Sequence, residues 1–410
     1  MAQLSGWASY SALAAAGLLV HASICSLFRF RRVNALQAEY GFHDRASLQG
    51  MTNEQAHRIV KHAATMEFPF AFDLGLRIAL FRTYAIDGIA KLLVASSDLN
   101  RPEHAPKRYE DTSAIFVSFI QFAPDSDTLA KAVARMNHLH GPYQKSGKIT
   151  NADLLYTLWA AMADPIHFMA LYEWRAMTDM EVAAVAMLWK YVGEMMDIDY
   201  EAELGQSQWI DGIDFYEKLT EWAHDYEEVA MKRLPQVQKL GAILIELLLS
   251  SYPRAVRSTA FNGILVLMGD RMRHYFRLPG PSIFDVSLVH GIMYMRKTFT
   301  RYFMLPRLTE VKFLSDPDPV TGRIHSFKYL KEPWYTPVTF WTRWGPEALL
   351  TWATGGQIPG DGGAEMLPEG FLYTDLGPRN KVGKGIEETQ QMEEQVKTRV
   401  SGWACPFAIK

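Results

Sequence analysis

The stretch SDTLAKAVARMNHLH, residues 126–140, shows which kind of secondary structure builds this chain. Its apolar side chains recur at steps of three and four residues, which is the spacing of one face of an α-helix. The side chains that share this face are Leu129, Val133, Met136 and His140. The stretch therefore predicts an amphipathic helix whose buried side carries one imidazole.

The same spacing continues through most of the chain. The other segments that show it are residues 51–68, 81–98, 151–174, 178–196, 212–233, 237–249 and 284–304. Strand-like alternation is scarce. Residues 305–346 are rich in proline, aromatic residues and turn signals, so they predict loops with at most a short hairpin. The sequence therefore predicts an all-α fold.

Polar residues in front of several segments predict where the helices begin. The expected N-caps are Thr52 or Asn53, Ser126 or Asp127, Asn151, and Thr178 with Glu181 in a capping-box pattern. The helix over residues 126–140 is expected to end near Gly141.

Composition excludes several classes of protein. The 410 residues are 49% hydrophobic and 12% aromatic, which is enough to fill a large core. The net charge is −3 and the basic residues are scattered, so there is no footprint for nucleic acid. Cys25 and Cys405 are the only cysteines, which excludes a disulfide framework and a cysteine-rich zinc or iron–sulfur site. Any bound iron must depend on histidine, carboxylate or tyrosine.

The N-terminus predicts a membrane anchor. Residues 7–28 contain no Asp, Glu, Lys or Arg and are long enough to cross a bilayer as a helix. Arg29, Arg31 and Arg32 follow at once, and no Lys or Arg precedes the span, so the bulk of the chain is expected on the cytosolic side. The alternative is an alanine-rich helix that packs on the domain.

These signals divide the chain into successive parts. They are a short N-terminal segment (1–6), the transmembrane anchor (7–28), a juxtamembrane connector (29–50), one helical catalytic domain (51–385) and a C-terminal helix or tail (386–410).

The two histidines of the MNHLH motif are expected to differ in role. Residues two apart on a helix point about 200° apart around its axis, so His138 and His140 cannot hold one metal ion while both are helical. His138 falls on the polar side with Lys131 and Arg135. His140 is the candidate ligand. The alternative is that its imidazole only makes a hydrogen bond in the core or to the free carbonyls at the helix end.

The segment KRYEDTSAIFVSFIQF, residues 107–122, carries a second candidate pair. Arg108 and Thr112 are four residues apart, so on a helix they present a guanidinium beside a hydroxyl. If that face is buried, the arginine needs an anion or several acceptors. The alternative is an arginine that pairs with a local glutamate on a solvated face.

With these segments in view, the chain resembles the fungal endoplasmic-reticulum-bound, MpaB-like oxygenases of mycophenolic acid biosynthesis, and more distantly the bacterial latex-clearing rubber oxygenases. The resemblance covers about residues 51–385. The strings that carry it, in this order, are EFPF (67–70), FRTY (81–84), KRYEDT (107–112), LHGPYQKSGKI (139–149), NADLLYTL (151–158), DRMR (270–273), RWGPEALLTWA (343–353) and VGKG (382–385).

The resemblance implies a single large helical domain that encloses a non-covalent haem b and follows one N-terminal transmembrane helix. It implies His140 as the axial ligand of the haem iron, and it places the family's Arg-x-x-x-Thr motif on Arg108 and Thr112. The rubber oxygenases carry a lysine where this chain has Asp111. Their arginine and second histidine beyond the ligand are replaced here by Gln144 and Lys145.

The resemblance also implies a reaction: O₂-dependent cleavage of a carbon–carbon double bond in the isoprenoid side chain of a prenylated substrate, at the endoplasmic reticulum membrane. Arg108 is expected to position haem propionates or polarise the distal site, Thr112 to donate a hydrogen bond, and Asp111 to act as a distal acid. The other residues considered are Arg82, Tyr84 and Tyr143 as haem contacts, and Asp270 with Arg271 as a packing ion pair.

Two alternatives remain at this point. One is a non-haem iron oxygenase that uses His140 with carboxylates such as Glu173. The other is a membrane-anchored carrier of haem or prenyl lipid, which would bind its ligand without consuming oxygen.

Overall fold

The computed structural model describes residues 2–96 and 98–400. Its helices, in chain order, are α1 (Ala2–Tyr40), α2 (Asn53–His62), α3 (Pro69–Thr83), α4 (Asp87–Ser96), α5 (Ala105–Gln121), α6 (Asp127–Lys145), α7 (Asn151–Tyr172), α8 (Asp179–Met195), α9 (Tyr200–Leu204), α10 (Gly212–Ala230), α11 (Pro235–Leu249), α12 (Arg257–Phe276), α13 (Ile283–Phe303), α14 (Phe340–Trp344), α15 (Pro346–Ala353) and α16 (Ile386–Val400). Within the described ranges, extended segments meet only in three isolated bridges. The all-α prediction is confirmed.

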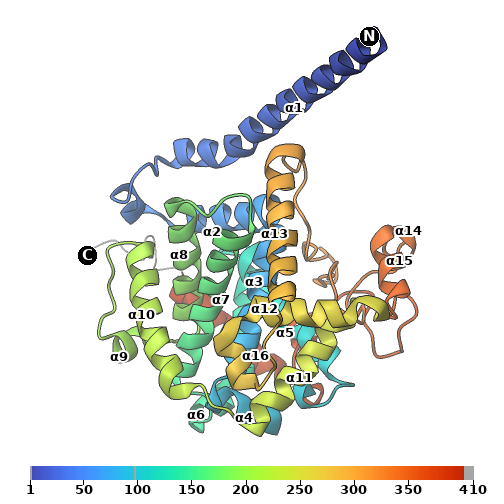
Figure 1. Ribbon diagram of the computed structural model, residues 1–410. Helices are drawn as coiled ribbons and strands as arrows, with labels where there is room; N and C mark the ends of the chain where they lie inside the picture. The colour runs from blue at the N-terminus through green and yellow to red at the C-terminus, as the bar shows by residue number, and fades with distance from the viewer. Residues whose placement is uncertain (1, 97, 401–410) are drawn as a thin grey trace.

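Helix α7 lies in the middle of the bundle and packs against α3, α8 and α10 (Figure 1). By length and composition α7 could cross a membrane, but 78% of its most apolar window is buried inside the protein. It is therefore the core helix of the bundle. Its approach to α3 is very close, because a Cβ added to Gly75 would lie 2.5 Å from the Cα of Pro165.

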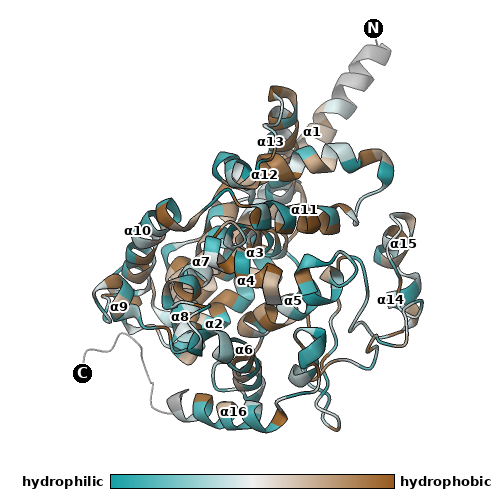
Figure 2. Cartoon of the chain, turned by 90° about the horizontal axis from the view of Figure 1, so that it is seen from below, coloured by the Kyte–Doolittle hydropathy of each residue, from teal (hydrophilic) through white to brown (hydrophobic). Residues whose placement is uncertain are grey.

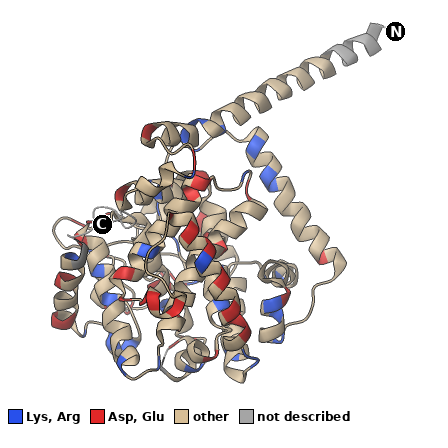
Figure 3. Ribbon diagram, turned by 90° about the vertical axis from the view of Figure 1, so that its left-hand side faces the viewer, with Lys and Arg blue, Asp and Glu red and all other residues tan. Residues whose placement is uncertain are grey.

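Helix α1 is the second helix apolar enough to span a membrane, and its most apolar window is only 6% buried. It projects from the bundle, and Figure 3 shows its described part free of charged residues until the basic residues near the domain. The helix does not stop at the end of the predicted anchor. It continues to Tyr40 because residues 29–40 contain no glycine or proline, and it ends where Gly41 adopts a φ of 73°.

Several predicted caps are present. Thr52 and Thr178 each form a capping box, and the Ser126 side chain accepts a hydrogen bond from the Leu129 backbone. The cap of α7 was placed one residue too late, because Thr150 rather than Asn151 accepts the first backbone N–H.

Other boundaries differ from the sequence pattern. The segment 81–98 is broken between α3 and α4, where Ile86 bridges to Met231. Helix α6 continues through Gly141 and Pro142 to Lys145. A proline in a helix removes one backbone hydrogen bond, and this loss does not end α6. The segment 305–346 contains isolated bridges as well as the short helix α14.

The predicted ion pair between Asp270 and Arg271 is wrong. Arg271 instead pairs with Glu227 and Glu228 of α10, at 3.2 Å and 2.6 Å, while Asp270 pairs with Arg273. Adjacent helical residues point about 100° apart, so each side chain meets its own neighbours.

The predicted C-terminal helix is present as α16, and residues 401–410 lie outside the described part of the chain. Figure 2 shows α16 as a largely hydrophilic helix at the edge of the molecule. It packs mainly against α6, and Val396 is buried in that contact.

Candidate functional site

A large cavity lies between α4, α5, α6, α7 and α8, and residues 378–381 close one side of it. The space between atoms measures about 1360 Å³, including the part open to solvent. Most of the residues that line it are apolar. Five of the residues singled out in the sequence do line it, namely Tyr84, Arg108, Thr112, His140 and Tyr143.

His140 reaches this cavity from α6, on the face predicted from the helical spacing. Its Nδ1 is buried and has no hydrogen-bond partner. Burial, and then the nearby positive charge of Arg108, lower the pKa of His140 to about 4. The imidazole is therefore neutral at physiological pH, which is the form that binds a metal ion.

Arg108 and Thr112 lie on the face of α5 that borders the same cavity. Arg108 Nη1 donates to Thr112 Oγ1 at 2.8 Å, and Thr112 Oγ1 donates to the Arg108 carbonyl at 2.9 Å. Arg108 Nε is buried without a hydrogen-bond partner. The arginine therefore does not sit on a solvated face beside a local glutamate, and part of its guanidinium is free to bind an anion.

Asp111 lies outside the residues that line this cavity. It is fully buried, receives hydrogen bonds from Lys107 Nζ at 2.9 and 3.1 Å, and is also bonded by Tyr335 and by the Gly377 backbone. Asp111 directly precedes Thr112 on the helix, so the two side chains point about 100° apart around the helix axis. This geometry gives Asp111 a role in holding residues 335 and 377 on α5.

Arg82 also lies outside the cavity lining. Its guanidinium donates to Asp164 at 2.9 and 3.0 Å and to Glu227 at 3.0 Å. Tyr84, from the same FRTY string, does line the cavity and is 2% exposed. The structure therefore brings Tyr84 and Tyr143 to the site and places Arg82 in a separate charged cluster.

His138 lies outside the cavity, as predicted, but its surroundings differ from the prediction. Arg135 is not on a polar surface. It is fully buried, and its guanidinium donates to the backbone carbonyls of Thr374, Leu376, Lys381 and Lys384. The C-terminal segment covers this face of α6, which the spacing within the helix alone does not reveal.

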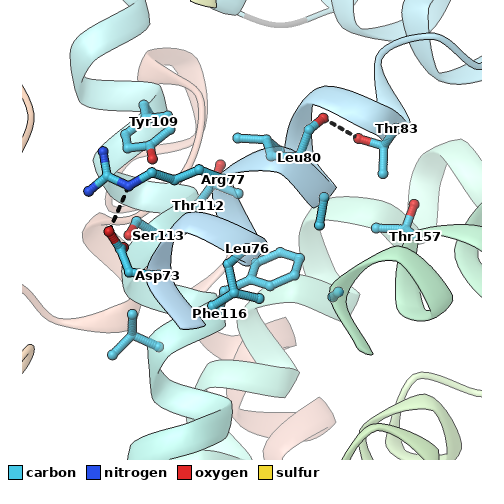
Figure 4. Close-up of a pocket in the computed structure, with 13 residues that line it drawn as sticks. Asp73, Leu76, Arg77, Leu80, Thr83, Tyr109, Thr112, Ser113, Phe116 and Thr157 are labelled. Atoms are coloured by element: carbon cyan, nitrogen blue, oxygen red, sulfur yellow. Dashed lines mark hydrogen bonds and ion pairs between the residues drawn. The ribbon is translucent and has the colours of Figure 1, made fainter. Parts of the chain in front are cut away.

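A second cavity adjoins the first between α3, α5 and α7 (Figure 4). Its space between atoms measures about 560 Å³. The residues that line both cavities are Leu80, Thr83, Thr112, Phe116 and Thr157. Its other end is polar, because Arg77 Nε donates to Asp73 at 2.8 Å. Thr112 thus stands where the two cavities meet.

The chain was compared with protein-family models and with curated proteins. No family model matches. The chain is 33% identical to the ER-bound oxygenase mpaB' of Penicillium brevicompactum over 95% of this chain and 93% of that protein. It is 33% identical to ER-bound oxygenase mpaB of the same species over 85% of this chain and 83% of the relative. An mpaB oxygenase of Penicillium roqueforti (strain FM164) is 35% identical over 63% of this chain and 88% of the relative.

The chain belongs to the MpaB family of ER-bound oxygenases.

Membership in the MpaB family confirms the resemblance drawn from the motifs and makes the protein an oxidoreductase of the oxygenase type. The relatives are named ER-bound, and this MpaB-family chain carries an apolar N-terminal helix that could span a membrane.

The site of this MpaB-family chain includes residues that the motifs did not single out. Lys148, Asn380 and Lys381 line the cavity, and the exposure of Lys148 and Asn380 marks where it opens to solvent. Lys148 belongs to the LHGPYQKSGKI string and Lys381 directly precedes VGKG. Their position in or beside these strings is the sequence feature that could have marked them as site residues. Their placement on one rim depends on the return of the C-terminal segment to α6.

The carboxylate proposed for a non-haem iron site lies elsewhere. Glu173 follows α7, is 1% exposed and pairs with Arg296 at 2.8 Å. Over residues 2–96 and 98–400 there is no group of three or more His, Cys, Asp or Glu side chains that could hold a metal ion. Among the described residues that line the cavity, His140 is the only histidine and Asp153 the only carboxylate.

Proposed function

We propose that this protein is a membrane-anchored, haem b-dependent oxygenase that cleaves a carbon–carbon double bond in the isoprenoid chain of a prenylated substrate. The observation that carries the proposal is that His140 and Arg108 both line one cavity. Each has a buried nitrogen without a hydrogen-bond partner, and both border the same largely apolar space.

The residues present fit a haem. The neutral imidazole of His140 would be the side chain that holds the haem iron. Arg108, Lys148 and Lys381 provide cations for carboxylates such as the propionates. We assign the haem to this cavity, whose space between atoms measures about 1360 Å³ including the part open to solvent.

The haem, when bound, supplies the chemistry of dioxygen activation. The protein's own residues set up the surroundings. The Thr112 hydroxyl donates its proton to the Arg108 carbonyl and accepts from the guanidinium, so Thr112 holds Arg108 in place. The unpartnered Nε–H of Arg108 would then be available to a propionate or to an oxygen atom of the substrate. The overall reaction adds both atoms of O₂ to the two alkene carbons and yields two carbonyl groups, so it needs no external reductant.

The substrate chain is assigned to the second cavity. Leu76, Leu80, Phe116 and Val117 give that cavity an apolar wall (Figure 4), and Thr112 lines both this cavity and the first. An isoprenoid chain that lies there would exclude water from the double bond.

The anchor is assigned to residues 7–28 as a single span, with the helical domain on the cytosolic side. The basic residues after the span support this orientation. An enzyme held at the membrane meets prenylated molecules where they concentrate.

The first test is an absorption spectrum of the purified protein with and without dithionite, in the wild type and in His140→Ala. We expect a Soret band in the wild type that is lost or shifted in His140→Ala. The matched control is His138→Ala, two residues away and outside the cavity, which should keep the wild-type spectrum. A haem-free wild type from cells supplied with haem precursor, or an unchanged spectrum in His140→Ala, would contradict the proposal.

A second readout separates the enzyme from a carrier. The haem-loaded protein with a farnesylated phenol should consume O₂ and release two carbonyl fragments that carry label from ¹⁸O₂. Binding of the phenol without O₂ consumption would favour the carrier. O₂ consumption by wild-type protein that shows a Soret band, together with its loss in haem-free His140→Ala, would exclude the non-haem iron alternative.

A further inference from the structure

The end of α13 exposes an unusual amount of apolar surface. No residue of α13 is buried in the protein. The exposed residues at its C-terminal end and just beyond are Met295, Phe299, Tyr302, Phe303, Met304 and Leu305, and their exposed fractions run from 36% to 64%. We call residues 295–305 the α13 tip. An apolar patch of this kind in water favours a partner that covers it.

The α13 tip lies against the anchor helix. His21 Nε2 is 3.1 Å from the Phe303 carbonyl, and Arg29 Nη2 donates to the Met304 carbonyl at 2.9 Å. Arg32 bonds with the Arg307 carbonyl. The backbone after Phe303 therefore returns along α1 from the apolar anchor toward its basic end, and Figure 1 shows α13 rising to meet α1.

This register gives the α13 tip a depth in the membrane. His21 lies seven residues inside Phe28, the last residue of the assigned span, and seven residues of α-helix rise about 10.5 Å. Amphipathic helices that lie in one leaflet bury their apolar face roughly 5–10 Å into the boundary between headgroups and acyl chains. A tip that reaches the level of His21 is therefore at the depth of an interfacial element.

We propose that the α13 tip is a second membrane-inserted element, which enters the cytosolic leaflet beside α1 without spanning the bilayer. This inference rests on the proposed assignment of residues 7–28 as the anchor. The partner that covers the α13 tip is the lipid bilayer itself, because the tip lies against α1, which the bilayer surrounds.

The charges next to the tip match this position. Lys297 and Arg301 lie one turn apart on α13. Arg31 lies on α1, and Arg307 lies in the segment that follows α13. The Arg301 guanidinium stands 5.3 Å from the centre of the Tyr302 ring and 5.8 Å from that of Phe30. Arginine and tyrosine at the edge of an apolar surface are typical of the headgroup region, where anionic lipids attract the cations.

Two attachments to the membrane, α1 and the α13 tip, would restrict how the domain rotates. A single span leaves the domain free to rotate about the helix axis, whereas a second contact beside it fixes which side of the bundle faces the lipid. The tip thus sets the orientation of the catalytic domain at the membrane.

The test measures depth at three single cysteines in the full-length chain, after Cys25→Ala and Cys405→Ser remove the native thiols. The positions are Leu305→Cys at the tip, Leu19→Cys in the anchor and Ile210→Cys, which is 63% exposed in the segment between α9 and α10. Each cysteine carries an environment-sensitive fluorophore, and the protein is reconstituted into phosphatidylcholine–phosphatidylserine vesicles with brominated acyl chains. Haem content and thermal unfolding of each labelled protein verify that it is folded.

We expect strong quenching at Leu19, clear quenching at Leu305 and none above background at Ile210. Quenching at Leu19 with Leu305 at the level of Ile210 would overturn the inference and leave the anchor in place. An unquenched Leu19 would reject the anchor, and the inference with it, whereas neither result bears on the Soret band that tests the haem site.

Discussion

At the scale of single residues, the position of a charged side chain in the fold decides whether it serves the site or the core. Arg108 and Arg82 are both arginines in strings shared with the family, yet Arg108 keeps a buried nitrogen without a partner while Arg82 is bonded to Asp164 and Glu227. The first is available to a ligand, and the second is already neutralised by its own carboxylates.

Arg82→Met tests this difference. Removal of one partner from a buried charge cluster leaves uncompensated carboxylates and typically costs about 3–5 kcal/mol. We therefore expect a large loss in the free energy of unfolding, measured by urea denaturation, with the Soret band retained at temperatures where the variant is folded. The control is Arg58→Met, which removes an exposed pair with Glu39 and should cost no more than about 1 kcal/mol. Selective loss of haem from well-folded Arg82→Met would return Arg82 to the site.

Glu110 predicts a pH dependence of stability. Burial raises the pKa of this carboxyl to about 8, and it accepts a hydrogen bond from the Leu330 backbone at 2.9 Å. The folded state thus binds one more proton than the unfolded state between about pH 4.5 and 8, so stability falls as pH rises through this window.

Glu110→Gln keeps the acceptor oxygen and cannot ionise. Relative to the wild type, we expect the variant to be similar at pH 5 and more stable by a few kcal/mol at pH 9, because each unit of pKa shift corresponds to about 1.4 kcal/mol. Guanidinium unfolding of both proteins across this range measures the difference. A difference between the two proteins that does not change with pH would show that Glu110 does not titrate in this window.

At the scale of elements, the close packing of α3 on α7 is the feature most sensitive to added volume. Gly75→Ala would put a methyl group 2.5 Å from the Pro165 Cα, so the two helices must separate. We expect a destabilisation of roughly 1–3 kcal/mol or more in thermal unfolding.

Gly141→Ala is the matched control, because an added Cβ there meets nothing within 4 Å and α6 gains a better helix former. It should be neutral or stabilising by about 0.5–1 kcal/mol. Equal effects of the two substitutions would show that helix propensity, and not the contact between α3 and α7, controls the outcome.

The same scale shows which element boundaries could be predicted. Where apolar residues recur clearly at steps of three and four and a side chain caps the helix, the start was predicted within a residue or two. The helices that begin after Ser126 and Thr178 are examples. The helix end near Gly141 was placed too early, since a glycine–proline pair does not stop α6. Helix α1 runs on past the predicted membrane span to Tyr40.

At the scale of the whole molecule, the cavity depends on segments far apart in the chain. Arg135 of α6 donates to four carbonyls between residues 374 and 384, and this contact holds Lys381 at the cavity that Arg108 also lines. The α13 tip likewise meets α1 across more than two hundred residues. The first of these pairings joins a helix to a loop whose own sequence carries no periodic signal, and the second joins two helices that are far apart in the chain.

The sequence by itself determined the helical class, the apolar N-terminal span, the inward face of His140 and the shared face of Arg108 and Thr112. Each of these follows from spacing along one helix, where geometry is fixed by the backbone. Only the tertiary structure decided that Arg82 and Asp111 turn away from the cavity, that Arg135 is buried, and that a second cavity adjoins Thr112. Burial and partner choice depend on which distant segment covers a face, and that is settled by packing of the whole chain.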